Sequence, residues 1–107
     1  MTAFEKESNL VASCLRIAEG MGVYVECIGQ RKARGSGTTI GAPDLLLFCA
    51  GHVIPVECKS IRGKATLAQM ARAYDREQQG VTTAFVSDDE DFIKLINTCR
   101  RGEWKQR

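Results

Sequence analysis

The chain has 107 residues, of which 44% are apolar and 26% are charged, and its formal net charge is +2 at pH 7. These values are typical of one soluble globular domain, so we expect a single domain over residues 1–107. No apolar run approaches the roughly 18 residues of a membrane span, and the polar N-terminus does not resemble a signal peptide. We therefore expect a cytoplasmic protein that is neither membrane-bound nor secreted.

The first predicted element is an amphipathic helix over residues 4–19, because apolar residues recur there at helical spacing. Thr2 and Glu5 could form a capping box at its start, and Gly20 and Gly22 would end it. A strand is predicted over residues 23–28. Residues 29–42 then hold four glycines and three basic residues without apolar periodicity, which predicts a mobile basic loop.

Two strands are predicted next, at about residues 44–49 and 53–59, joined by a tight turn. The first is apolar at every position from Leu45 to Phe48, which is typical of a central strand covered on both faces. Pro55 lies in the second strand and cannot donate a ladder hydrogen bond. We therefore expect a bulge or an unpaired side in the first half of that strand.

A helix over residues 66–79 is indicated by the apolar stripe of Leu67, Met70, Ala71 and Tyr74. A short strand at 82–86 and a last helix opened by a Ser87/Glu90 capping box follow. The helical crossover predicts that the 53–59 and 82–86 strands are parallel. The chain is thus predicted to be a small α/β domain with an αβββαβ core, a C-terminal helix, a mixed sheet flanked by helices, and a tail over residues 101–107.

The most informative motif is Gly41-Ala42-Pro43-Asp44 followed by Glu57-Cys58-Lys59. A hairpin would place Asp44, at the start of one strand, beside Glu57, at the end of the other. Residues two apart share a strand face, so Lys59 points the same way as Glu57, and Cys58 points into the core. The alternative is that Asp44 is a turn residue and that Glu57 and Lys59 lie on a solvated strand face.

Two carboxylates and a lysine in this arrangement suit phosphodiester hydrolysis. Carboxylate oxygens are ligands that Mg²⁺ prefers, and Mg²⁺ takes its remaining ligands from water and substrate phosphate. Asp44 and Glu57 are therefore candidate metal ligands, with the backbone carbonyl of Cys58 as a further one. A charged Lys59 could orient the attacking water or stabilise charge developing on phosphorus. No Ser/His/Asp set competes, and His52, the only histidine, is expected to be a surface turn residue.

Glu7 and Gln69 are further candidates. Glu7 falls in the middle of the apolar stripe of the first helix, where a carboxylate is costly unless it is paired or bound to a metal. Alternatively, it stays wet near the helix end and favours the helix dipole. Gln69 lies on a polar strip with Arg72 and Arg76, although Thr66-x-x-Gln69 also fits a capping box.

Other charged groups have simpler explanations or a binding role. The acidic run at residues 88–91 is expected to favour a helix N-terminus rather than to form a metal cluster. Basic residues flank the predicted site from two loops, where we expect them to bind nucleic-acid phosphates. These are Arg31, Lys32 and Arg34 in the first loop and Arg62 and Lys64 in the second.

A third basic cluster surrounds Trp104, whose role is left open between base stacking and dimer packing.

The five cysteines are scattered along the chain without a C-x-x-C pair. This spacing argues against a zinc site and against a disulfide framework. Most of them lie in apolar runs, as buried thiols do, which is consistent with a reducing compartment.

Together, Glu7, the Gly41-x-Pro43-Asp44 motif, Glu57-x-Lys59, the Gly63-containing loop and Gln69 resemble the PD-(D/E)XK nuclease superfamily. More narrowly, they resemble its virus-type replication-repair nuclease (VRR-NUC) branch. The resemblance covers roughly residues 5–90, and each core motif position is filled. It implies a restriction-endonuclease-like core and Mg²⁺- or Mn²⁺-dependent hydrolysis of DNA. Asp44 and Glu57 would then bind the metal, Lys59 would be catalytic, and Glu7 and Gln69 would support them, with Glu7 as a possible further ligand.

Stand-alone members of this branch occur in phages and bacteria and resemble Holliday-junction resolvases in being dimers. We therefore expect a structure-selective DNA nuclease that acts as a homodimer on branched DNA, in a DNA-repair setting, without a small-molecule cofactor. Two alternatives remain open: a nucleic-acid-binding module of the same fold that does not cut, and a sequence-specific restriction-type endonuclease. The second is disfavoured because so short a chain has little material for reading base edges.

Overall fold

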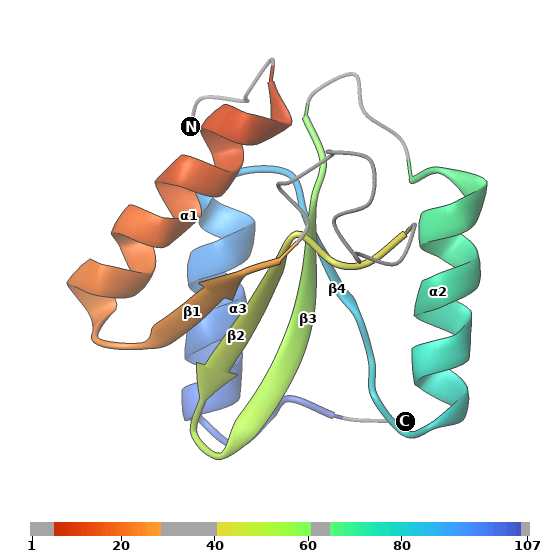
Figure 1. The fold of residues 1–107 in the computed structure, drawn as a ribbon. Coiled ribbons are helices and arrows are strands. Elements are labelled where there is room, and N and C mark those ends of the chain that lie inside the picture. The colour runs from red at the N-terminus through yellow and green to blue at the C-terminus, as the bar shows by residue number, and fades with distance from the viewer. Residues whose placement is uncertain (1–5, 29–40, 61–64, 106–107) are drawn as a thin grey trace.

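The computed structural model describes residues 6–28, 41–60 and 65–105 (Figure 1). The elements follow in the predicted order of helix, three strands, helix, strand and helix. They are α1 (Glu7–Met21), β1 (Tyr24–Cys27), β2 (Leu45–Cys49), β3 (His52–Cys58), α2 (Leu67–Gln78), β4 (Ala84–Val86) and α3 (Asp89–Arg100). The prediction of a small α/β domain with a mixed sheet is confirmed. No helix within the described ranges is both long enough and apolar enough to cross a bilayer.

The sheet has the strand order β1-β2-β3-β4. β1 and β3 each pair antiparallel with β2, whereas β4 runs parallel to β3, as the helical crossover predicts. Pro55 lies opposite Leu46 of β2, and β4 begins only opposite the next residue, Val56. The predicted unpaired side of Pro55 is therefore confirmed: it faces the position that β4 has not yet reached.

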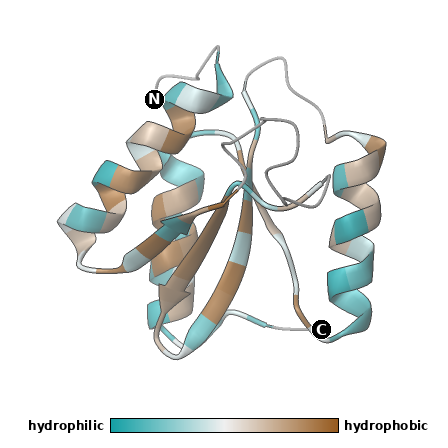
Figure 2. Cartoon of the chain, in the orientation of Figure 1, coloured by the Kyte–Doolittle hydropathy of each residue, from teal (hydrophilic) through white to brown (hydrophobic). Residues whose placement is uncertain are grey.

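The core lies between one face of the sheet and the helices α1 and α3, which lie together on that side (Figure 1). The strands carry apolar residues toward these helices, and Figure 2 shows the hydrophobic segments gathered in the sheet and on the facing helix surfaces. Fully buried side chains from α1, β2, β3 and α3 meet there: Leu10, Cys14, Leu45, Leu47, Ile54, Val56, Phe92 and Ile96. β2 is central as predicted, but only one of its faces is fully covered, since Leu46 and Phe48 on the other are half-buried.

Helix α2 is oriented opposite to the usual amphipathic arrangement, in which the apolar stripe packs into the core. It has no buried residue. Its stripe faces away from the protein, with Leu67 84%, Met70 53% and Tyr74 61% exposed. The polar strip faces the sheet instead, because Gln69 and Arg76 on this strip contact the buried Glu57 of β3.

Two predicted helix ends are wrong by a few residues. α1 begins at Glu7 after Lys6, which provides no side-chain cap. The predicted Thr2/Glu5 box lies outside the described residues. Gly20 is inside the helix, and Gly22, with φ of 74°, ends it as predicted.

The start of α3 differs from the predicted Ser87/Glu90 capping box. Asp88 is the N-cap, and its Oδ1 accepts from the Asp91 backbone N–H at 2.8 Å. Asp91 Oδ2 in turn accepts from the Ser87 backbone N–H at 2.9 Å. An aspartate one residue later thus caps the helix with a charged acceptor, which favours the helix N-terminus further, and Asp91 holds the residue before the cap. The expectation that the acidic run serves a helix N-terminus agrees with this geometry.

The corrected cap makes a testable distinction between neighbouring residues. Replacing Asp88 with alanine should lower the free energy of unfolding by about 1 kcal/mol, because an N-cap acceptor is lost. Urea denaturation followed by circular dichroism measures this. The matched change Ser87→Ala should alter stability by no more than a few tenths of a kcal/mol, and an equal loss in both variants would contradict the assignment.

Candidate active site

The hairpin of β2 and β3 brings Asp44 and Glu57 together. Leu45 pairs with Val56, so the residue before Leu45 and the residue after Val56 are neighbours at the same end of the two strands. Asp44 is buried, and its Oδ2 accepts from the Cys58 backbone N–H at 2.8 Å. This hydrogen bond fixes the Asp44 carboxylate beside β3.

The loop before Asp44 passes very close to α2. Gly41 has φ of 87°, and a Cβ built on it would lie 2.5 Å from the Ala68 carbonyl oxygen. A side chain at this position would therefore clash with the backbone of α2 and would adopt an unfavourable conformation. The glycine in the Gly41-x-Pro43-Asp44 motif thus allows the chain to lie against α2 just before it supplies the aspartate.

Glu57 is the most constrained group of the site, with none of its surface exposed. Its Oε1 accepts from Gln69 Nε2 at 3.3 Å, whereas its Oε2 has no hydrogen-bond partner among the described residues. Burial, and to a lesser extent nearby Asp44, together raise the pKa of Glu57 to about 7, although Lys59 and Arg76 act in the opposite direction. Glu57 is therefore a fully buried carboxylate with one oxygen that accepts no hydrogen bond from the described residues.

Lys59 is also buried and lies at the centre of the polar contacts. Its Nζ donates to Gln69 Oε1 at 2.5 Å and lies 3.7 Å from Glu7 Oε2. Glu7, whose side chain is 40% exposed, therefore reaches the site through Lys59 and remains partly wet. No contact joins Glu7 to Asp44 or Glu57 among the described interactions.

Gln69 performs both roles that its position allows. Its backbone N–H donates to Thr66 Oγ1 at 3.1 Å, and its Oε1 accepts from the Thr66 backbone N–H at 2.9 Å, which completes a capping box. The same Oε1 accepts from Lys59, and the amide nitrogen donates to Glu57. The Gln69 side chain therefore both caps the start of α2 and links Lys59 to Glu57 in the site.

Arg76 is a site residue to which sequence reasoning assigned no role. It lies two turns after Gln69 on the polar strip of α2, and its Nη2 is 3.9 Å from Glu57 Oε2. Burial lowers its pKa, an effect opposed by Glu57 and reinforced by Arg72. The signal that could have identified it was the i, i+7 spacing from Gln69 on the same helix face.

Five predicted residues are not placed. The basic residues predicted to bind DNA lie outside the described residues: Arg31, Lys32, Arg34, Arg62 and Lys64.

Cys58 has its thiol buried in the core, as predicted, which leaves only its backbone near the site. His52 begins β3 opposite Cys49, at the other end of the hairpin from Glu57, and is half-buried rather than a surface turn residue.

The residues present fit a divalent cation of the magnesium type. Among the described residues, no group of three or more histidines, cysteines, aspartates or glutamates is gathered as a metal cluster. Mg²⁺ does not require one, because it commonly uses one or two carboxylates and completes its coordination with water and phosphate. The free, buried Oε2 of Glu57 beside Asp44 is the observation that favours such a ligand.

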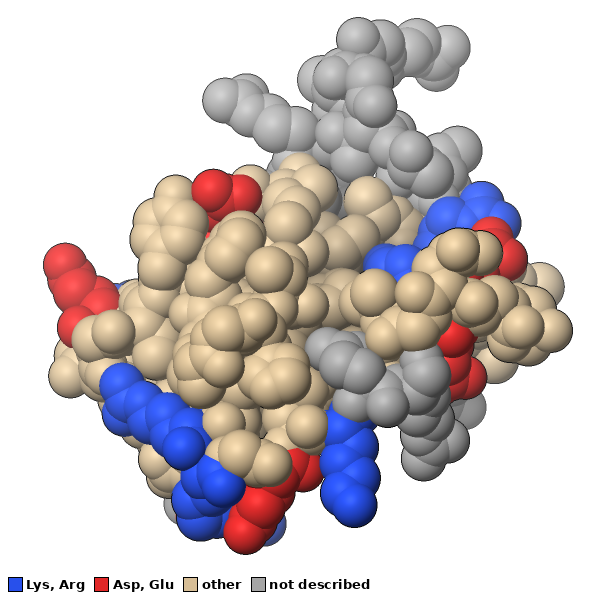
Figure 3. All heavy atoms as spheres, turned by 90° about the horizontal axis from the view of Figure 1, so that it is seen from below, with Lys and Arg blue, Asp and Glu red and all other residues tan. Residues whose placement is uncertain are grey.

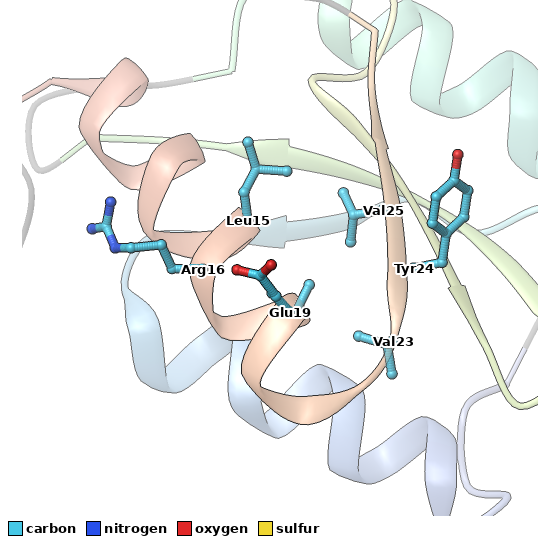
Figure 4. A pocket seen from close by; sticks show the side chains of 7 residues that line it. Leu15, Arg16, Glu19, Val23, Tyr24 and Val25 are labelled. Atoms are coloured by element: carbon cyan, nitrogen blue, oxygen red, sulfur yellow. The ribbon is translucent and has the colours of Figure 1, made fainter.

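A separate groove lies between α1 and β1 (Figure 4). It has a volume of about 420 Å³, and Leu15, Val23 and Val25 line it together with Arg16 and Glu19. Glu19 is twelve residues from Glu7 on the same helix, which corresponds to about 18 Å at 1.5 Å per residue. The groove is therefore distinct from the carboxylate–lysine cluster.

Comparisons with protein-family models, curated proteins and solved structures find no match to this chain.

The burial of Glu57 predicts a pH-dependent stability. A carboxyl whose folded pKa is raised is protonated more readily in the folded state, so the folded state loses stability as pH rises from about 4.5 to about 7. Glu57→Gln removes this penalty. In chelator it should raise the free energy of unfolding by up to about 3 kcal/mol at pH 8, with little change at pH 4.

Denaturant unfolding at both pH values measures this effect, with the exposed first-turn residue changed in Glu90→Gln as the control. Equal stability of Glu57→Gln and the unmodified protein at pH 8 would contradict a raised pKa for Glu57.

Proposed function

We propose that this protein is a divalent-metal-dependent DNA nuclease that hydrolyses phosphodiester bonds. The observation that supports the proposal most is the fully buried Glu57, which has one oxygen without a hydrogen bond among the described residues and lies beside Asp44 and Lys59. A fully buried carboxylate with only one of its oxygens hydrogen-bonded destabilises a fold, so its presence next to a second carboxylate favours a ligand-binding role. The resemblance of the same residues to the PD-(D/E)XK pattern agrees with this interpretation.

Each residue has a defined task in such a reaction. Asp44 and Glu57 would hold Mg²⁺ or Mn²⁺, which supplies neutralisation of phosphate charge and activation of water. Lys59, held by Gln69 and Glu7, would direct its ammonium group toward the negative charge that develops on the phosphate oxygens. Gln69 would hold the Lys59 ammonium group and the Glu57 carboxylate in fixed positions relative to each other, since its amide contacts both.

DNA would approach the edge where the N-terminal end of α1, the C-terminal end of β3 and the N-terminal end of α2 lie (Figure 1). Figure 3 views the molecule from the opposite end, where charged side chains lie around the periphery and uncharged residues occupy the middle. That face offers no central cluster of described Lys or Arg side chains for a phosphate backbone. The site edge is therefore the favoured surface for nucleic acid.

The nuclease proposal predicts the behaviour of two single variants. Asp44→Ala and Lys59→Ala should each reduce Mg²⁺-dependent cleavage by at least about 100-fold. The first removes a ligand of the metal, and the second removes the ammonium group that stabilises negative charge developing on the phosphate oxygens. A gel assay with duplex, single-strand, flap and four-way-junction DNA, in Mg²⁺, Mn²⁺ or chelator, measures the loss.

Glu90→Ala is the matched control, since it removes a carboxylate outside the site. Binding of branched DNA without cleavage in either metal would support the non-cutting module instead, and cleavage of plain duplex at one defined sequence would support a restriction-type enzyme.

The proposed substrate class is branched DNA, cut by a homodimer. A two-fold dimer needs a patch that complements itself, and the outward stripe of α2 has this property. In an antiparallel pair of α2 helices, Leu67 of one copy would lie near Tyr74 of the other, with Met70 and Ala71 at the centre. The stripe is apolar and exposed, as dimer surfaces are before association.

Self-association through α2 predicts that Leu67→Glu and Tyr74→Glu produce monomers, because a charge would be buried in the contact. Sedimentation velocity over a range of concentrations distinguishes the two states. Leu15→Glu, which changes an exposed apolar residue on α1, is the control and should remain dimeric. A monomeric unmodified protein that cuts flaps as readily as junctions would contradict the dimer.

A further inference from the structure

Arg76 is an unusual buried cation. Its side chain is only 19% exposed, and its Nε and Nη2 atoms have no hydrogen-bond partner among the described residues. The nearest described carboxylate atom is Glu57 Oε2, at 3.9 Å from Nη2, which is too long for a hydrogen bond but close enough for a strong charge interaction. Arginine is rarely buried unless it is paired, so the only described charge partner of Arg76, the metal-ligand candidate Glu57, links Arg76 to the site.

Neighbouring Arg72 shows that burial is not general to the helix. Arg72 lies one turn earlier on α2 and donates to exposed Asp75 at 2.6 Å from Nη2 and 3.0 Å from Nε. Its guanidinium is thus satisfied within α2. Arg76, in contrast, has no hydrogen-bond partner for its Nε and Nη2 atoms among the described residues, and its Nη2 faces Glu57 Oε2.

The charges of the site are close to balance without any added ion. The carboxylates of Asp44, Glu57 and Glu7 lie with two cations, Lys59 and Arg76. A divalent cation that binds beside Glu57 Oε2 must therefore enter next to a positive guanidinium. Because the region is buried, this repulsion is screened less than it would be at the surface.

The sign of the effect does not depend on the prior protonation of Glu57. If Glu57 is ionised, metal binding replaces an attraction to Arg76 by a repulsion. If Glu57 is protonated, metal binding creates a repulsion where there was almost no charge interaction. In both cases Arg76 opposes the metal, and additional negative charge from a substrate phosphate offsets that opposition.

We propose that Arg76 is a built-in counter-cation that keeps the affinity of the Asp44/Glu57 site for divalent metal low until nucleic-acid phosphate binds. The inference rests on the proposed function, because it takes this pair as the metal site and nucleic acid as the substrate. Arg76 is a positioning residue, because its described contact with the site is with Glu57. The consequence is that metal and DNA bind cooperatively.

The test is the dissociation constant for Mn²⁺ without DNA, obtained from the electron paramagnetic resonance signal of free Mn²⁺ at pH 7.5. Arg76→Met removes the charge and keeps much of the side-chain length, and it should tighten Mn²⁺ binding by at least about tenfold. Arg76→Lys keeps the charge and should remain within about threefold of the unmodified protein. Arg72→Met removes a charge one turn away on the same helix and should change the constant less than twofold.

Cooperativity with DNA is measured by repeating the titration with a phosphorothioate four-way junction, which resists hydrolysis. The unmodified protein should bind Mn²⁺ more tightly with the junction present, and Arg76→Met should gain much less. Circular dichroism and thermal melting establish that each variant is folded. If Arg76→Met does not fold, Arg76→Gln replaces it.

Three results would overturn the inference: Mn²⁺ binding no tighter in the charge-removing variants, equal tightening in Arg72→Met, or no effect of the junction on the unmodified protein. Its failure is distinguishable from failure of the nuclease proposal. A protein that binds Mn²⁺ with the expected pattern but does not cut DNA supports the role of Arg76 and contradicts the nuclease. Absence of Mn²⁺ binding in all variants, with and without the junction, contradicts both.

Discussion

The structure depends on a carboxylate placed where a carboxylate is least stable. Glu57 lies one residue before the end of β3. It is fully buried, and one of its oxygens has no hydrogen-bond partner among the described residues. Leaving a charged group in this environment costs several kcal/mol unless other charges compensate for it. The surrounding groups offset this cost, since Gln69 and Arg76 face the Glu57 carboxylate and the positive charge of nearby Lys59 also favours its ionised form.

This constraint explains the orientation of α2. A helix with Leu67, Met70 and Tyr74 on one face would ordinarily bury that face. Here the face opposite to the apolar stripe provides Gln69 and Arg76 to the buried acid, and the stripe remains exposed. The close approach of Gly41 to the backbone of Ala68 then fixes the start of α2 against the loop that supplies Asp44. Site and helix position each other.

The element order, the parallel β3–β4 pair and the proximity of Asp44 to Glu57 could all be predicted from sequence. They follow from local patterns: apolar runs, a short turn and a helical crossover. The orientation of α2 could not, because periodicity identifies a helix face without saying what that face contacts. The predicted N-cap of α3 was one residue too early, because Ser87 and Asp88 are both good N-cap residues and the backbone geometry decides between them. Glu7 was expected either to be paired or metal-bound or to stay wet, and the structure shows part of both: it is 3.7 Å from Lys59 and its side chain is 40% exposed.

The central claim is that Asp44 and Glu57 form a divalent-cation site with Lys59 beside it. The most direct measurement is anomalous X-ray scattering from crystals grown or soaked in Mn²⁺, recorded near the manganese absorption edge. The account predicts one strong anomalous peak within coordination distance of an Asp44 oxygen and of Glu57 Oε2. A well-ordered site with no peak there, or with manganese bound only elsewhere on the molecule, would contradict it.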